Sequence, residues 1–328
     1  MMFNWIARWL DLSPATGTPG ARRAPATSAS AGVALVDDLP SVDLPLLFYR
    51  LLAGPTPTTI LPPAEKLILD ELTRLADTPQ AGADLVPRVP EVVPQLLRSL
   101  RDDSISNAEF SRQVAQDLVL VAEVIREANS SYYRPSRPIN TIEGAVMLLG
   151  QNGIRMLLAR VAFRPIIGNQ TGRFARLAAP TVWRQSEMCA QAAGMLAPSM
   201  HANAFESYLA GLLHHVGLIV AFRLIDQVCT GDALPASDQF VTELLANARL
   251  MSSRIAVLWG FPDAVSSAIA NAGKPYAAPI AHVLESADRV ATLRLLVDAG
   301  RLGRRDPAVE ALDPAAMECF EKLSSEDD

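Results

Sequence analysis

Cysteines are few in this sequence and form no recognisable motif. The three that are present, Cys189, Cys229 and Cys319, are isolated, and no two are spaced as Cys-x-x-Cys. Three thiols cannot all pair within one chain, so free thiols in a reducing cytoplasm are the simplest expectation. Cys189 has no activating partner near it in the sequence, and we expect a core thiol rather than a nucleophile.

Long hydrophobic runs are missing as well. No segment reaches about 18 uninterrupted apolar residues, the length that a membrane-spanning helix needs. The longest candidate, Leu209 to Ile225, contains His214, His215 and Arg223. Met1 to Leu10 has neither a leading cluster of Lys or Arg nor an extended apolar core, unlike a signal peptide. We therefore expect no transmembrane segment and a cytoplasmic location.

Positive charge is not in excess, and common phosphate-binding and nucleophile motifs are absent. A net charge of −6 and a pI near 5.3 give no general attraction to nucleic acid, so no nucleic-acid partner is expected. There is no glycine-rich loop with a Walker lysine and no G-x-S-x-G elbow. These absences exclude the standard phosphate-loop and serine-hydrolase sites.

The sequence does have enough apolar residues for a large helical core. It contains 328 residues, of which 50% are hydrophobic and 20% charged, and at about 100 to 200 residues per domain this length indicates two lobes. After Ser106, five apolar residues from Phe110 to Ile125 recur at spacings of four, four, three and four, which is one helix face. No alternating β-branched run is present. We predict an all-α protein, a two-lobed helical bundle, with helices at 42–53, 62–78, 106–129, 141–149, 153–163, 181–196, 204–224, 238–259, 262–271 and 278–299.

The amino-terminal residues 1–12 carry a short apolar stripe. Phe3, Ile6, Trp9 and Leu10 recur at helical spacing, with Trp5 beside them, on a segment too short to be stable alone in water. Residues 13–36, rich in Ala, Pro, Ser and Thr, are expected to form a flexible linker. The segment would dock into a protein groove or lie peripherally on a membrane surface through its aromatic residues, or it would pack back onto its own domain.

Two adjacent histidines, His214 and His215, stand inside the apolar stretch from Tyr208 to Val220. The pair resembles the metal-binding His-Asp step of HD-type phosphohydrolases, with the Asp replaced by His215. In that superfamily a His before this step and an Asp after it complete a site for one or two divalent ions that activate a water.

Three further stretches resemble the HDOD family, the HD-related output domains of bacterial signalling proteins. They are Arg88–Leu97 with its Pro-x-x-x-Pro opening, Ala128–Ala145 followed by Leu148-Leu149-Gly150, and Trp259-Gly260-Phe261-Pro262. Together the matches span roughly residues 85 to 295. The resemblance implies an N-terminal helical lobe and an HD-like C-terminal lobe.

The sequence departs from an active HD site at several positions. Gln185 stands where the first His ligand is expected, and only Asp288 stands where the last carboxylate is expected. An amide ligates divalent ions poorly compared with imidazole or carboxylate. The resemblance therefore implies that Gln185, His214, His215 and Asp288 mark a former HD site, and we predict no catalytic residue, no bound metal and no cofactor.

A second polar and aromatic group follows the expected helix end near residue 129. Asn129, Ser130, Tyr132 and Tyr133 would form either an interaction or inter-lobe surface, or a helix-end cap with the tyrosines packed against the next helix.

These features predict the following organisation and function. The segments are 1–12, the linker 13–36, accessory helices at 37–80, an HDOD-like domain at 81–300 (lobes at about 81–175 and 176–300) and a C-terminal extension with an acidic tail at 301–328. The resemblance implies a non-catalytic signal-transduction output or scaffold module that contacts other signalling proteins. The alternatives are a metal-dependent phosphohydrolase or cyclic-dinucleotide phosphodiesterase, and a nucleotide sensor without turnover.

Overall fold

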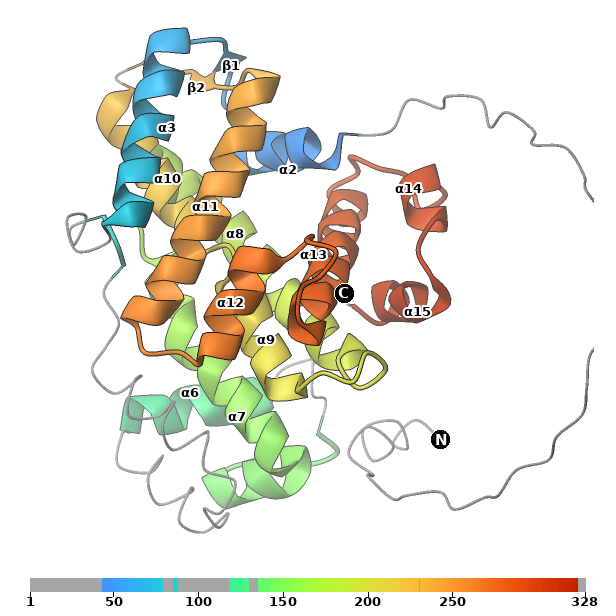
Figure 1. The fold of residues 1–328 in the computed structure, drawn as a ribbon. Coiled ribbons are helices and arrows are strands. Elements are labelled where there is room, and N and C mark those ends of the chain that lie inside the picture. The colour runs from blue at the N-terminus through green and yellow to red at the C-terminus, as the bar shows by residue number, and fades with distance from the viewer. Residues whose placement is uncertain (1–42, 79–84, 88–117, 130–134, 230, 324–328) are drawn as a thin grey trace, which may run out of the picture. The chain divides into compact units, whose positions relative to one another are not determined.

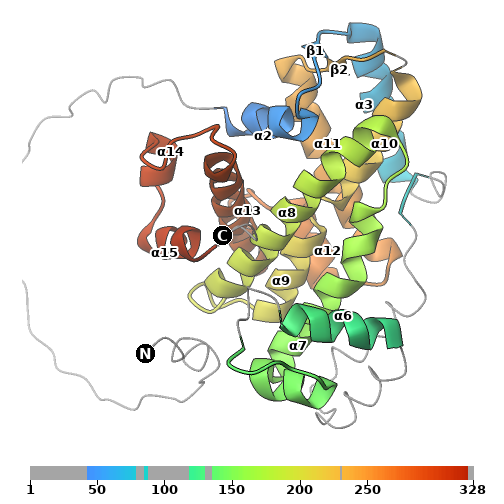
Figure 2. The ribbon, with the colours of Figure 1, turned by 180° about the vertical axis from the view of Figure 1, so that it is seen from behind.

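Helices form nearly all the regular structure of residues 43–78, 85–87, 118–129, 135–229 and 231–323, the part of the chain that the computed structural model describes (Figures 1 and 2). Within this part there are twelve helices and one parallel pair of two-residue strands, β1 (Thr58–Thr59) and β2 (Leu234–Pro235). The helices are α2 (Leu44–Ala53), α3 (Pro62–Asp77), α6 (Leu118–Ala128), α7 (Ile142–Gly168), α8 (Arg173–Leu196), α9 (Ala204–Leu213), α10 (Val216–Val228), α11 (Asp238–Leu258), α12 (Asp263–Asn271), α13 (Pro279–Asp298), α14 (Pro307–Glu310) and α15 (Pro314–Lys322). The all-α prediction is confirmed.

Local signals explain where several of these helices begin and end. The Asp43 carboxylate accepts a hydrogen bond from the Leu46 backbone N–H at 3.0 Å, and α2 ends at Gly54, whose φ of 58° suits glycine. The hydroxyl of Ser237 accepts from the Phe240 N–H at 3.2 Å and starts α11. Such capping residues fix the helix boundaries because they satisfy backbone groups that the first and last turns leave unpaired.

The expected separation of helices at 141–149 and 153–163 is confirmed, because Gly150, with φ 68° and ψ 173°, breaks the helical geometry inside α7 between them. Other predicted boundaries differ from the structure, and α8 begins at Arg173 rather than at residue 181. The expected single helix at 204–224 is instead two helices, α9 and α10, which meet at His214 and His215. Hydrophobic periodicity did not show this break because the stretch is apolar on nearly every face.

Helix α8 packs against α9, α10, α13, α7, α2 and α15 and is central to the buried core. A helix that approaches α8 closely needs a small residue at the point of contact. A Cβ on Gly211 of α9 would lie 2.7 Å from the Ala190 Cα of α8, closer than real side chains approach. The accessory helix α3 lies beside α11 and α10, as both views show (Figures 1 and 2).

One described stretch, Ala204–Val228, is long and apolar enough by composition to cross a membrane. However, 89% of its most apolar window is buried against other helices, and the stretch is divided at His214 and His215. Those features are typical of core helices.

Candidate functional site

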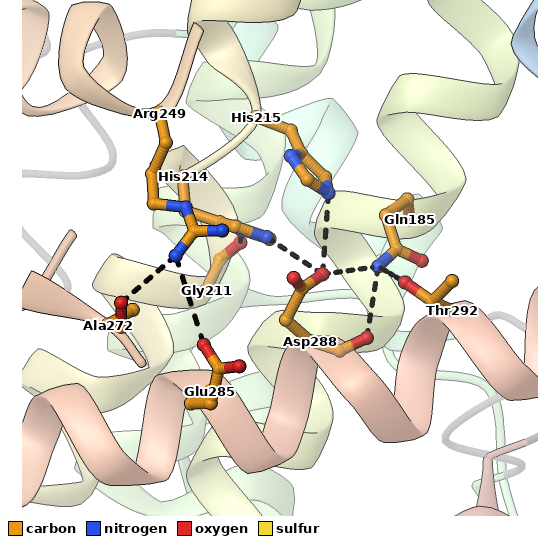
Figure 3. A network of polar contacts seen from close by, with 9 residues as sticks. All are labelled: Gln185, Gly211, His214, His215, Arg249, Ala272, Glu285, Asp288 and Thr292. Atoms are coloured by element: carbon orange, nitrogen blue, oxygen red, sulfur yellow. Dashed lines mark hydrogen bonds and ion pairs between the residues drawn. The ribbon is translucent and has the colours of Figure 1, made fainter. Parts of the chain in front are cut away.

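His214 and His215 lie at the junction of α9 and α10, and both side chains face Asp288 of α13 (Figure 3). Their Nε2 atoms lie 3.0 and 3.4 Å from the Asp288 Oδ1 atom. On a continuous helix adjacent side chains diverge by about 100°, and only one of the pair would be expected to face a given pocket. That expectation is wrong here, because the backbone leaves the helix at His215, with φ −104° and ψ 3°.

A backbone carbonyl fixes the orientation of the His214 ring. Its Nδ1 atom lies 2.9 Å from the Gly211 carbonyl oxygen, one turn earlier on α9. A carbonyl can only accept a hydrogen bond, so Nδ1 carries the proton and Nε2 is the atom presented to Asp288. The side chain is 97% buried, which keeps this arrangement away from bulk water.

Gln185 of α8 holds the other side of Asp288. Its Nε2 group donates hydrogen bonds to the Asp288 Oδ1 atom at 2.8 Å and to the Thr292 Oγ1 atom at 2.9 Å. Gln185 is fully buried, so these bonds replace the water that its amide loses on folding. The amide, which the sequence resemblance places where the first His ligand is expected, therefore acts as a hydrogen-bond donor to the carboxylate.

The electrostatics of the three ionisable groups are coupled. Burial, together with the adjacent His214 ring, lowers the pKa of His215 to about 4, and the contact with Asp288 only partly opposes this shift. Burial alone would raise the pKa of Asp288, but the contacts of both imidazoles with its carboxylate outweigh this effect. They hold that pKa well below its ordinary value. Asp288 is therefore a carboxylate at neutral pH.

Cys189 also belongs to the cluster. Its sequence context had predicted only a core thiol. It lies four residues after Gln185 on α8 and is fully buried, and burial, with Asp288 and Cys319 nearby, raises the pKa of its thiol. The donor atoms of Cys189, His214 and Asp288 all lie within 4.8 Å of one another. The spacing of one helical turn from Gln185 was the available signal, since residues at i and i+4 share a helix face.

Phe48 and Arg249 border the site. Phe48 of the accessory helix α2 stacks on His215, with ring centroids 5.2 Å apart and planes inclined by 24°. Arg249 of α11 donates to the Ala272 carbonyl oxygen at 3.0 Å and lies 3.9 Å from Glu285 (Figure 3). The Asp288 side chain remains 28% exposed, so the site is closed on the His215 side and reaches solvent beside Asp288.

The other predicted sites lie apart from this cluster or outside the described residues. The Asn129 side chain donates to the Ile125 and Ile139 carbonyl oxygens and accepts from the Ile139 N–H, each at 2.7 Å. These bonds connect the end of α6 to the segment before α7. The Asn129 amide therefore acts at a helix end, in the capping role. Ser130, Tyr132 and Tyr133, and the docking residues Phe3, Trp5 and Trp9, lie outside the described residues.

The residues present do not fit the ion set of an HD phosphohydrolase. Such a site needs an imidazole where Gln185 stands and a carboxylate where His215 stands. Gln185 instead directs its N–H donors at Asp288 and Thr292, so its amide nitrogen offers no lone pair to an ion at the position where the first ligand is expected. No catalytic step through such an ion can be derived from these residues.

The family of this chain is identified by a family model that covers more than half of it. The model of the HDOD domain matches residues 86–275. A relative from Treponema pallidum (strain Nichols), described as an uncharacterized protein, is 24% identical over 176 residues, which are 52% of this chain and 33% of the relative. The chain therefore spans about a third of the length of that curated relative.

Solved structures of similar fold come from several bacteria. An HDOD domain protein of unknown function from Geobacter sulfurreducens is 24% identical, with a TM-score of 0.56 over 77% of this chain and 94% of that one. A putative metal-dependent phosphohydrolase from Shewanella amazonensis SB2B is 17% identical, with a TM-score of 0.53 over 79% and 97%. A putative signal transduction protein from Marinobacter aquaeolei VT8 is 22% identical, with a TM-score of 0.51 over 79% and 65%. At these identities the likeness establishes the fold.

Proposed function

Because this chain belongs to the HDOD domain family, we propose that it is a non-catalytic signal-transduction module that acts as an output or scaffold through contacts with other signalling proteins in a bacterial cytoplasm. The family relates the chain to signal-transduction-like domains and to metal-dependent phosphohydrolases. The observation that carries the non-catalytic part is the hydrogen bond from the Gln185 amide to Asp288.

Gln185 acts on Asp288 as a hydrogen-bond donor, whereas an ion would need a ligand. A phosphohydrolase ion is bound by lone pairs and must keep an open position for the attacking water. Gln185 presents N–H groups to both Asp288 and Thr292, and turning the amide over would give up the two hydrogen bonds at 2.8 and 2.9 Å. The Gln185 amide group therefore makes its two hydrogen bonds in an arrangement that does not suit a hydrolytic ion.

Phe48 supports the same proposal from the opposite side of the site. Its ring covers His215 and is itself only 4% exposed, so α2 is part of the core around the site. The Asp288 side chain is 28% exposed, and its carboxylate disfavours a dianionic phosphoester on this side, whereas Glu285 lies 3.9 Å from the Arg249 guanidinium (Figure 3).

The catalytic part of the proposal is tested with the purified full-length chain and a panel of phosphomonoesters, phosphodiesters and cyclic dinucleotides. Each is incubated with Mg²⁺, Mn²⁺, Fe²⁺ or Zn²⁺, and a His214→Gln variant is measured beside the wild type. We expect no turnover above the protein-free blank for either protein. Metal-dependent turnover in the wild type that is lost in His214→Gln would establish the phosphohydrolase alternative instead.

The partner part of the proposal needs a different readout. Affinity capture from the bacterium that encodes this chain should return the same stoichiometric partners with the wild type and with His214→Gln, because the contacts do not depend on the former HD site. A partner that is captured by the wild type and lost in a folded His214→Gln protein would place the interaction at this site. Nucleotide sensing is checked by thermal shift, since a bound nucleotide raises the melting temperature by mass action.

A further inference from the structure

The geometry points to a single Zn²⁺ site of altered composition, in which Cys189 Sγ, His214 Nε2 and an Asp288 carboxylate oxygen bind the ion and His215 Nε2 completes the shell. The first three donor atoms lie within 4.8 Å of one another. The His215 Nε2 atom lies 3.4 Å from the Asp288 Oδ1 atom. This donor set differs from a hydrolytic HD site because it includes sulfur and omits residue 185.

The Nε2 lone pair of His214 points toward the Asp288 carboxylate. Its Nδ1 proton is committed to the Gly211 carbonyl, so the neutral ring turns an unprotonated Nε2 toward a carboxylate oxygen 3.0 Å away. Two lone pairs at this distance repel unless a positive charge lies between them. Either a second proton on His214 or a metal ion can supply that charge.

Hydrogen-bond direction favours the metal over the proton. Although both Nε2 atoms approach Asp288 closely, neither His214 nor His215 makes a hydrogen bond of acceptable direction through Nε2, and both atoms are buried. A buried polar atom without a partner costs about 1 to 3 kcal/mol. One cation bound by both nitrogens and the carboxylate would satisfy all three groups at once.

The distances also suit one ion. With bonds of about 2.3 Å to sulfur and 2.0–2.1 Å to nitrogen and oxygen, donors around a tetrahedral Zn²⁺ lie roughly 3.3 to 3.7 Å apart. The His214–Asp288 and His215–Asp288 separations of 3.0 and 3.4 Å are close to this range. A small rotation of the Cys189 side chain brings the sulfur into the shell from its position within 4.8 Å.

The donor chemistry selects the metal and its role. Thiolate and imidazole together favour Zn²⁺ over Mg²⁺ or Ca²⁺, which prefer oxygen. Binding requires the Cys189 thiol to lose its proton to solvent, because the thiolate is the ligand. Four protein ligands leave no coordination position for a water, so the ion would stabilise the α8, α9 and α13 junction rather than catalyse hydrolysis.

The backbone carbonyl of Gly211 fits this role. Metal-binding histidines usually donate their second ring N–H to a carbonyl or carboxylate, which fixes the tautomer and the ring orientation. His214 has this contact through Nδ1 at 2.9 Å.

The test uses full-length protein stripped with a chelator and then titrated with Zn²⁺ alone or Co²⁺ alone. We expect one ion per chain by elemental analysis, and a thiolate-to-cobalt charge-transfer band in the near ultraviolet. Cys189→Ser should abolish the band and weaken Zn²⁺ binding at least about ten-fold. Cys229→Ser is the matched control, because Cys229 caps α10 outside the donor cluster and its loss should change neither result.

Zinc X-ray absorption of the wild type keeps the inference testable if Cys189→Ser fails to fold. One sulfur among the ligands is expected, whereas a shell of nitrogen and oxygen alone would overturn the site. Failure to retain stoichiometric zinc, or unchanged binding in Cys189→Ser, would also overturn it. None of these readouts uses a substrate, so the zinc site can fail while the non-catalytic proposal stands, and the reverse also holds.

Discussion

At the scale of single residues, Gln185 determines what the former HD site can do. Its fully buried amide replaces the expected imidazole and donates to Asp288 and Thr292. The same carboxylate faces two histidines, so Asp288 is the group around which the cluster is arranged (Figure 3).

Replacing Gln185 should cost stability rather than activity. Gln185→Leu removes two donors and leaves Asp288 and Thr292 short of partners in a buried setting. We expect the free energy of unfolding to fall by about 1 to 3 kcal/mol, measured by urea denaturation of chelator-treated protein.

Gln239→Leu is the control for this measurement. Gln239 is exposed on α11 and donates only to Glu243, one turn away, at 2.7 Å. Its loss should change stability by less than about 0.5 kcal/mol. Equal effects of the two substitutions would mean that the Gln185 network contributes nothing beyond a surface contact.

Some of the cluster could be predicted from the sequence and some could not. The resemblance identified Gln185, His214, His215 and Asp288, and the structure brings all four together. Cys189 was treated as a core thiol although it lies one turn from Gln185. Phe48 could not have been found from the sequence, because no local pattern connects it with His215, which lies 167 positions later.

At the scale of helices, the junction of α9 and α10 gives the site its geometry. The sequence predicted the bounds of α11, α12 and α13 to within a few residues, because apolar spacing agrees there with a local start signal, which is the Ser237 cap for α11 and a proline for α12 and α13. It missed the break at His214 and His215, where tertiary contacts of α10 with α8 and α11 determine the chain direction.

Gly217, in the first turn of α10, allows the close crossing with α11. A Cβ at this position would lie 2.0 Å from the Ala248 carbonyl oxygen and 2.9 Å from the Ser252 N atom. Gly217→Ala should therefore force the two helices apart and lower the free energy of unfolding by about 3 kcal/mol or more. Gly168→Ala, whose Cβ would meet nothing within 4 Å, should leave stability unchanged or slightly raised. The stabilities of both variants are measured by thermal and urea unfolding. A Gly217→Ala protein as stable as the wild type would show that α10 and α11 do not need a glycine where they cross.

Phe48 connects the accessory helix α2 with the site. Phe48→Ala removes a 96% buried ring and its stacking on His215, which should cost about 3 kcal/mol. It should also speed the modification of His215 by diethylpyrocarbonate, followed by mass spectrometry. Arg50→Ala, on the exposed face of the same helix, should alter neither quantity. A His215 that reacts equally fast in both variants would show that α2 does not close the site.

At the scale of the whole molecule, the site is assembled from segments inside and outside the family match. The match ends at residue 275, whereas Asp288 lies on α13, and Phe48 lies before its start at residue 86. Further contacts connect the accessory segment to the matched region. The Tyr49 hydroxyl donates to the Pro235 carbonyl at 2.7 Å, and the Glu65 carboxylate accepts from the Ser237 backbone N–H and hydroxyl at 3.1 and 2.7 Å.

This division predicts opposite outcomes for two truncations. A chain of residues 35–328 keeps α2 and α3 and should melt within about 2 °C of the full length. A chain of residues 81–328 loses both helices, whose buried side chains include Tyr49, Leu52, Ile68 and Leu72. At about 1.5 to 3 kcal/mol for each large apolar side chain, this loss is comparable to the whole stability of a typical domain, about 5 to 15 kcal/mol, and we expect an aggregated or unfolded product by calorimetry and size exclusion.

The chain of residues 35–328 also tests the role of the amino-terminal arm, residues 1–34. The sequence assigns residues 1–12 an apolar, tryptophan-bearing stripe and 13–36 a linker composition, which favour recruitment over folding. If the arm recruits, the 35–328 chain should keep its melting temperature and lose partner capture or its normal cellular position. A chain that keeps both would refute recruitment by the arm. One that keeps its partners but melts several degrees lower would show that the arm packs against its own domain.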